Sequence, residues 1–128
     1  MIEYSQLTSR YLLKMFPEFK KEINAQIAFL EEELPHCIYA NVINPFLRGY
    51  FKKPNLSDAK LVERIFKFYE DLAVNGDFET KCLLQVSLLE PLWDYRESYS
   101  GAQKFMGSET KVIFDSISAY VNIPKRSL

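Results

Sequence analysis

The sequence contains few of the residues that form tight turns and cross-links. Its 128 residues include four glycines, six prolines and two cysteines. So few turn residues argue against a β-sandwich, which needs many tight corners between its strands. The two cysteines, Cys37 and Cys82, are too few for a disulfide framework. We expect two free, largely buried thiols in a reducing cytoplasm, and a structural or redox disulfide is the alternative.

A dominant charge and long hydrophobic runs are also missing. The 16 basic and 17 acidic side chains give a formal net charge of −1, so no overall attraction to nucleic acid or to an anionic membrane is expected. The apolar runs fall far short of the roughly 20 residues that a membrane-spanning helix needs. The first 30 residues carry seven charges and show no signal-peptide pattern. The sequence therefore predicts a cytoplasmic protein whose partner is neither a membrane nor a nucleic acid.

The sequence does contain enough apolar material for a hydrophobic core. Hydrophobic residues make up 48% of the chain and aromatic residues 15%, which excludes a disordered protein. A chain of this length corresponds to about one domain. We therefore expect a single domain over residues 1–128.

Apolar side chains recur with the helical period, and no segment shows the alternation that is typical of a strand. The clearest helix is predicted over residues 57–75, with Ser57 as its N-cap and Asn75-Gly76 as its stop. A second helix, capped by Asp77, is predicted to run to about Glu90. This second helix is apolar on almost all sides, which is typical of a central helix. The positions in it that we expect to be buried are Leu83, Leu84, Val86 and Leu89.

Prolines mark the ends of several other predicted helices. The residue before a proline avoids helical geometry, so one helix is expected to end at Phe16-Pro17 and the next at Leu34-Pro35. A third helix follows, and we expect Pro45 to break or kink it because proline removes a hydrogen bond and clashes with the preceding turn. Residues 52–55 are predicted to form an exposed loop.

The C-terminal part of the sequence completes the predicted fold. Ser108 is expected to cap a last helix that runs to Tyr120, and residues 124–128 are expected to be frayed. Short connections make successive helices antiparallel. The sequence thus predicts an all-α fold, either a compact bundle or a short solenoid-like stack of about six antiparallel helices.

No combination of residues indicates a catalytic or metal site. His36 is the only histidine, and its neighbour Cys37 cannot face it on a helix. The sequence has no Cys-x-x-Cys, His-x-x-x-His or Glu-x-x-His spacing and no phosphate-binding glycine loop. We therefore expect no enzymatic activity, no cofactor and no metal ion.

Residues 90–99 hold the residue types that anchor protein interfaces, namely tryptophan, tyrosine and arginine among acidic residues. Trp93 is expected to pack in the core. Residues 58–97 carry nine acidic and five basic side chains, and this local net charge of −4 would suit a basic protein partner rather than a nucleic acid. The candidate partner-binding residues are Glu90, Asp94, Tyr95, Arg96, Glu97 and Tyr99.

Three stretches, FPEFKKEI, KLVERIFKFYEDLAVNGDFETKCLLQVSLLEPLWD and MGSETK, cover about half of the chain. In these stretches the chain resembles a group of small all-α bacterial proteins, mostly of unassigned function, that includes immunity proteins of contact-dependent growth inhibition. The resemblance implies a non-enzymatic protein that binds and neutralises the C-terminal domain of a cognate toxin. It transfers no binding residue, because these residues vary with the toxin. The near-neutral charge argues against a highly basic nuclease as the target.

The same residues also fit a helical adaptor or a regulatory subunit of a cytosolic complex. Such a protein would share the small size, the helical fold and the interface-type residues of an immunity protein. A toxin gene immediately upstream would favour the immunity function over this alternative.

Overall fold

Helices make up the regular structure of the computed structural model, which describes residues 1–29 and 34–128. Within these residues there is no strand, only an isolated parallel bridge between Ile2 and Gly76, and the all-α prediction is confirmed. The α-helices are α1 (Ser9–Met15), α2 (Lys20–Phe29), α3 (Pro35–Lys52), α4 (Leu56–Asn75), α5 (Phe78–Cys82), α6 (Arg96–Gln103) and α7 (Ser108–Ser116). The 3-10 helices are η1 (Tyr4–Gln6), η2 (Pro17–Phe19), η4 (Glu90–Trp93) and η5 (Ile117–Ala119), and η3 (Leu83–Leu89) is a π-helix.

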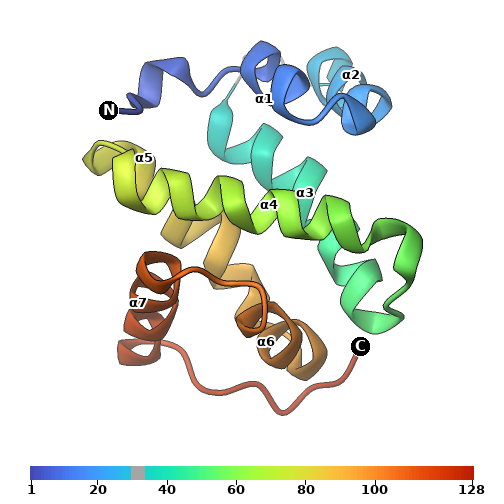
Figure 1. The fold of residues 1–128 in the computed structure, drawn as a ribbon, viewed down its shortest axis with the longest axis vertical. Coiled ribbons are helices and arrows are strands. Elements are labelled where there is room, and N and C mark those ends of the chain that lie inside the picture. The colour runs from blue at the N-terminus through green and yellow to red at the C-terminus, as the bar shows by residue number, and fades with distance from the viewer. Residues whose placement is uncertain (30–33) are drawn as a thin grey trace.

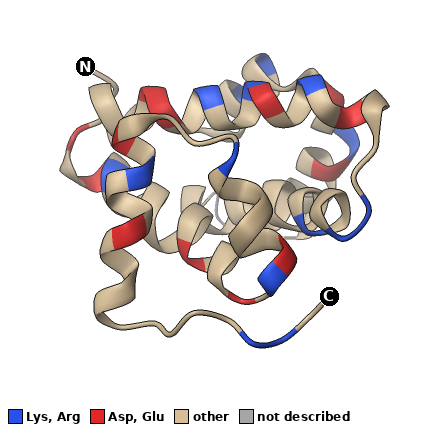
Figure 2. Cartoon of the chain, turned by 60° about the horizontal axis from the view of Figure 1, so that its bottom comes forward, with Lys and Arg blue, Asp and Glu red and all other residues tan. Residues whose placement is uncertain are grey.

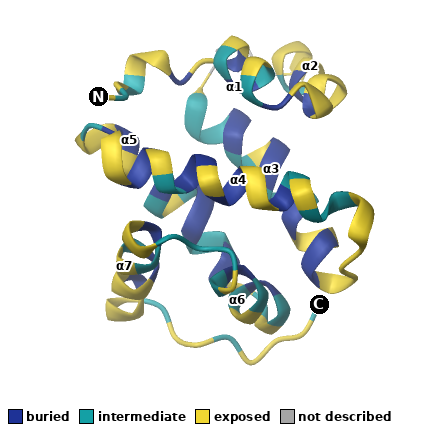
Figure 3. Cartoon of the chain, viewed as in Figure 1, coloured by how far each residue is buried: buried dark blue, intermediate teal, exposed yellow. Residues whose placement is uncertain are grey.

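The two long helices α3 and α4 cross at the centre of the molecule (Figure 1). Helices α1 and α2 lie on one side of α4, and α6 and α7 lie on the other side. Helix α3 packs against η3 and α6, and α4 packs against α7. One cluster of buried apolar side chains joins these layers, and the central helices turn their buried faces toward it (Figure 3).

The N-cap of helix α4 lies two residues before the expected one. The Asn55 side chain accepts a hydrogen bond of 2.9 Å from the Asp58 N–H, and it also accepts one of 2.7 Å from the Ser57 hydroxyl. Asn55 is therefore the N-cap, and the prediction of Ser57 was wrong because both residue types cap equally well from sequence. The predicted end of the helix at Asn75 is confirmed.

The two prolines near the N-terminal layer act differently. Pro17 begins the 3-10 helix η2 directly after α1, which confirms the predicted helix end at Phe16-Pro17. Pro45, in contrast, lies inside the uninterrupted helix α3. Its side chain is exposed, while Ile43 and Leu47 beside it are fully buried, and their packing offsets the one hydrogen bond that proline removes. The helix predicted to run to Leu34 includes residues 30–33, which lie outside the described residues.

The single helix predicted over residues 78–90 is instead wound in three ways, as α5, the π-helix η3 and the 3-10 helix η4. Pro91 has no N–H to donate to the Ser87 carbonyl, which lies four residues before it. Instead, the side-chain amide of Asn44 in α3 donates a hydrogen bond of 2.9 Å to this carbonyl. The Ser87 hydroxyl shares a hydrogen bond of 2.5 Å with the His36 ring. The only histidine therefore joins α3 to η3.

The burial of η3 matches the sequence prediction at three of four positions. Leu83, Leu84 and Leu89 are fully buried, but Val86 is 52% exposed, so that part of the prediction was wrong. Helix η3 packs against α3, α4 and α7, and Val86 lies on the side that these neighbours leave open. The sequence could not predict this exposed side, because apolar residues are distributed around the whole helix.

Asp77 caps α5, as the sequence predicts, and also holds the N-terminus. Its carboxylate accepts hydrogen bonds from the Thr80 N–H (2.9 Å) and from the Tyr4 N–H (3.0 Å). The hydrogen bonds from Thr80, followed by the one from Tyr4, lower the pKa of Asp77. The Ile2 N–H donates to the Asn75 carbonyl at 2.7 Å, so the first residues lie along the end of α4.

Candidate functional site

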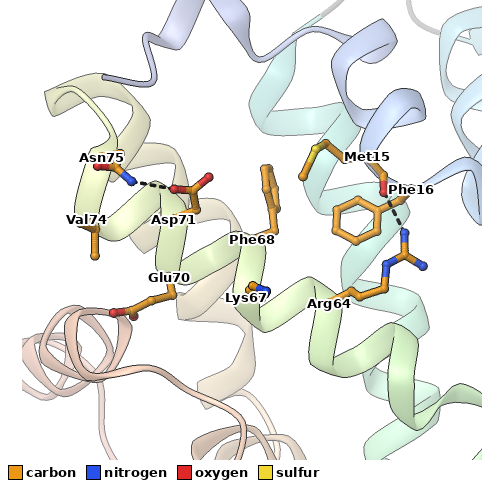
Figure 4. A pocket seen from close by; sticks show the side chains of 9 residues that line it. All are labelled: Met15, Phe16, Arg64, Lys67, Phe68, Glu70, Asp71, Val74 and Asn75. Atoms are coloured by element: carbon orange, nitrogen blue, oxygen red, sulfur yellow. Dashed lines mark hydrogen bonds between the residues drawn. The ribbon is translucent and has the colours of Figure 1, made fainter.

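A groove of about 550 Å³ lies on the outer face of α4, between the end of α1 and the C-terminal half of α4 (Figure 4). This volume falls within the range of about 300–1,000 Å³ that is usual for binding pockets. The residues that line the groove are Met15, Phe16, Arg64, Lys67, Phe68, Glu70, Asp71, Val74 and Asn75.

Apolar side chains from two helices line the inner part of this groove. Met15 and Phe16 come from the end of α1, and Phe68 comes from α4. The Phe16 and Phe68 rings meet edge to face with their centroids 5.5 Å apart. Val74, the residue before the last one of α4, is 53% exposed and extends the apolar surface. Phe16 and Phe68 are buried, so they form the floor of the groove, and Met15 and Val74 supply the apolar surface that a partner could reach.

Charged side chains stand around this apolar surface. The Arg64 guanidinium pairs with the Glu18 carboxylate and donates to the Met15 carbonyl at 2.9 Å. The hydrogen bond from Arg64 lowers the pKa of Glu18. Asp71 accepts a hydrogen bond of 2.6 Å from Asn75. No ion pair involves Lys67 among the described residues, so its ammonium is available to a ligand.

Glu70, at one end of the groove, caps a different helix. Its carboxylate accepts hydrogen bonds from the Glu109 N–H (3.1 Å), the Thr110 N–H (2.8 Å) and the Thr110 hydroxyl (2.7 Å). The N-cap of α7 is Gly107, which has no side chain to accept a capping hydrogen bond. The prediction of Ser108 as the cap was therefore wrong by one position, since Ser108 is the first helical residue. Partial burial opposes the ionisation of Glu70, but the hydrogen bonds from Thr110 and Glu109 outweigh it and lower the pKa. Glu70 therefore fixes α7 against α4.

The structure places Tyr99 and Trp93 in an aromatic cluster with Phe114 of α7. The Tyr99 ring lies 4.8 Å from the Trp93 ring and 5.6 Å from the Phe114 ring, between centroids. Trp93 is buried, as expected. Tyr99 is half-buried, so much of its side chain is committed to packing rather than free for a partner. Glu90 accepts a hydrogen bond of 3.2 Å from the Tyr120 hydroxyl.

The C-terminal residues 124–128, expected to be frayed, instead return to the start of α6. The Arg96 N–H donates to the Arg126 carbonyl at 2.8 Å. The Glu97 carboxylate accepts hydrogen bonds from the Ser127 hydroxyl and from the Leu128 N–H, the latter at 2.9 Å. The Ser127 hydrogen bond, followed by that of Leu128, lowers the pKa of Glu97. The prediction of a frayed end was wrong because these bonds join residues about 30 positions apart.

Two arginines from distant parts of the chain lie over the Tyr95 ring. The guanidinium carbon of Arg48 is 5.3 Å from the ring centroid, and that of Arg126 is 5.1 Å from it. Asp94 and Arg96 beside the ring are exposed. The surface predicted to be acidic and aromatic is therefore of mixed charge, because folding adds two cations that lie outside residues 58–97. Sequence reasoning missed this gathering, and no local pattern could have shown it.

The remaining candidate groups are not assembled into a reactive site. Cys37 and Cys82 are free and half-buried. Across residues 1–29 and 34–128, no three histidine, cysteine or carboxylate side chains are placed to hold a metal ion. In the same ranges, no helix has both the length and the apolar character needed to cross a membrane.

Comparison with known proteins yields one family. The family described as "Domain of unknown function (DUF7674)" matches residues 9–122. The match begins at the first residue of α1 and leaves out η1 and the residues that reach α6 from the C-terminal end. No curated protein and no solved structure matches the chain.

Proposed function

We propose that this chain, which belongs to the DUF7674 family, functions by binding another protein through the groove on α4. The single observation that supports the proposal is the groove itself, which combines accessible apolar side chains, Met15 and Val74, with charged side chains around them. Surfaces of this composition are typical of sites that take the apolar face of a partner helix and orient it by its charges.

The occupant that fits this groove is an amphipathic helix with an acidic residue beside its apolar face. Met15 and Val74 offer the accessible apolar contact above the buried rings of Phe16 and Phe68. Lys67 is an exposed cation that lines the same groove and makes no ion pair among the described residues. An acidic side chain of the helix would pair with Lys67, while its apolar side chains fill the groove. Arg64 is already held by Glu18, so it shapes the groove rather than selecting the partner.

We propose further that the bound protein is the C-terminal domain of a toxin, and that this chain is its non-enzymatic, cytoplasmic immunity protein. The support is the sequence resemblance to immunity proteins together with a surface suited to a protein ligand. A helical adaptor would use the same groove without neutralising a toxin. Both functions require a complex with another protein, and they differ in whether that complex protects cells.

We expect Val74→Arg to weaken the complex by about tenfold or more, because the charged side chain would fill an apolar part of the groove. An arginine near the C-terminal end of α4 is compatible with the helix dipole and with Glu70 and Asp71, so the fold should be kept. The measurement is calorimetric titration with the C-terminal domain of the product of the adjacent upstream gene, with circular dichroism as the folding check.

The matched control is Val112→Arg, since Val112 is 63% exposed on α7 and does not line the groove. It should leave the affinity unchanged. Growth of cells that co-express the toxin domain should be rescued by the wild type and not by Val74→Arg. A complex without rescue would support an adaptor, whereas equal effects of the two valine substitutions would place the interface elsewhere.

A further inference from the structure

Two of the five arginines in the chain lie over the Tyr95 ring at one corner of the fold, and a third is the next residue after Tyr95. The arginines are Arg10, Arg48, Arg64, Arg96 and Arg126. Arg48 near the end of α3 and Arg126 in the C-terminal segment both lie over the Tyr95 ring. Arg96 follows Tyr95 in the chain, and its backbone N–H donates a hydrogen bond of 2.8 Å to the Arg126 carbonyl. Figure 2 shows basic positions on the C-terminal segment and on the helix end nearby.

Arg48, Arg96 and Arg126 form no salt bridge in the described part of the chain. Glu97 uses both of its oxygens for Ser127 and Leu128. These hydrogen bonds lower the pKa of Glu97 and the charge of Arg96 adds to the effect, so Arg96 interacts with Glu97 while Arg48 and Arg126 lie over Tyr95. Arg48 and Arg126 are held against the Tyr95 ring, so less conformational entropy is lost when they bind a ligand. Arg48 and Arg126, which are oriented by the ring and form no salt bridge among the described residues, are therefore suited to an anionic ligand.

We propose that this arginine cluster, defined as Arg48, Arg96 and Arg126 around Tyr95, binds an acidic segment of the partner protein. The inference rests on the proposed function, since it names the chemistry of a second contact with that partner. Guanidinium groups match the planar fork of a carboxylate and can bind it through two hydrogen bonds. The result is the opposite of the basic partner that the local sequence charge predicts for this region.

The charges around the cluster favour a peptide over a nucleic acid. Asp94 is exposed next to Tyr95, and Glu97 lies in the first turn of α6. A nucleic acid carries its phosphates at regular short intervals, so it would bring negative charge close to both carboxylates. An acidic peptide carries its charges on flexible side chains and not on its backbone, so its carboxylates can turn toward the arginines and away from Asp94 and Glu97. We therefore expect selectivity for carboxylate side chains.

Glu97 is a positioning residue for this cluster. It carries negative charge, but its two oxygens hold the C-terminal segment that places Arg126 over Tyr95. Replacing Glu97 removes a repulsive charge and also releases Arg126. The Asp94 carboxylate makes no hydrogen bond or ion pair among the described residues, so its replacement removes only the charge. The two acids should therefore act in opposite directions.

We expect the full chain to bind a fluorescein-labelled decaglutamate peptide at low salt and to release it as salt is raised, as measured by fluorescence anisotropy. Arg48→Ala and Arg126→Ala should each weaken binding by about two- to fivefold, the range for one exposed ion pair. The control Arg10→Ala removes the same charge from an exposed position on α1 and should leave the affinity unchanged. Equal weakening by all three substitutions would overturn the proposal, because it would show non-specific attraction.

The acidic positions provide a second test. Asp94→Ala should strengthen binding of decaglutamate, while Glu97→Ala should weaken it toward the level of Arg126→Ala. If both substitutions strengthened decaglutamate binding, removal of negative charge alone would explain the data. That result would overturn the role of Glu97 and the C-terminal segment in positioning Arg126. Tighter binding of a ten-nucleotide oligothymidylate than of decaglutamate would also overturn the proposal, in favour of a nucleic acid.

These outcomes separate the cluster from the groove. The peptide lacks apolar side chains, so Val74→Arg should not change its binding. Loss of partner binding in Val74→Arg with decaglutamate binding intact is expected under both proposals. Binding of decaglutamate by a chain that binds no toxin domain would keep the arginine cluster and remove the toxin partner. Failure to bind decaglutamate, with toxin binding retained, would overturn the cluster alone.

Discussion

Leu89→Ala is expected to lower the free energy of unfolding by about 2–5 kcal/mol, the cost of lost burial plus the cavity that remains. Leu89 is fully buried at the end of the π-helix η3. Helix η3 packs against α3, α4 and α7, so a cavity there lies among several helices that are held by other contacts and cannot collapse freely. Urea unfolding followed by circular dichroism measures the change through the shift in midpoint.

Val86→Ala is the matched control for Leu89→Ala. It shortens an apolar side chain in the same π-helix, but at a position that is 52% exposed. Surface substitutions of this kind change stability by about 0.5 kcal/mol or less. A midpoint for Leu89→Ala equal to that of Val86→Ala would contradict the central position of η3.

Glu70→Ala is expected to destabilise the protein by about 1–3 kcal/mol. The substitution removes the acceptor of three hydrogen bonds, two from backbone N–H groups at the start of α7 and one from the Thr110 hydroxyl. Gly107 cannot replace it, because glycine has no side chain to cap the helix. Thermal unfolding measures the loss, and hydrogen exchange should show it first at the start of α7.

The contribution of Glu70 should depend on pH in a defined direction. Hydrogen bonds lower its pKa in the folded state, so its stabilising effect is complete above the unfolded pKa of about 4.3. This effect is lost as the pH falls through the lower, folded-state pKa. Glu70→Gln should therefore reduce the acid sensitivity of unfolding below about pH 4.3. Glu63→Gln, an exposed position on α4, should keep the wild-type slope apart from its own small charge effect.

The charge of the partner is where local sequence and tertiary structure disagree most. Nine acidic and five basic side chains in residues 58–97 predict a basic partner. The fold uses Glu70 to cap α7 and Glu97 to hold the C-terminal segment, and it brings Arg48 and Arg126 to Tyr95. A count of charges along the chain does not show which of them are already satisfied within the fold.

The sequence by itself determined the helical class and most of the helix boundaries, because these depend on local physics. Helical periodicity places one face of α4 in the core, Asn75-Gly76 ends that helix, Asp77 caps α5, and Phe16-Pro17 separates the first two helices. Each of these signals acts within a few residues. The same locality explains why the cap of α4 could be misplaced by two positions between Asn55 and Ser57.

Only the tertiary structure decided the binding surfaces and the contacts of η3. The groove needs the end of α1 beside α4, and the Ser87 carbonyl, which Pro91 cannot serve, accepts a hydrogen bond from the Asn44 side chain of α3. The arginine cluster needs α3, α6 and the C-terminal segment at one corner of the fold. These contacts join residues tens of positions apart, and the packing of the helices determines which of them meet.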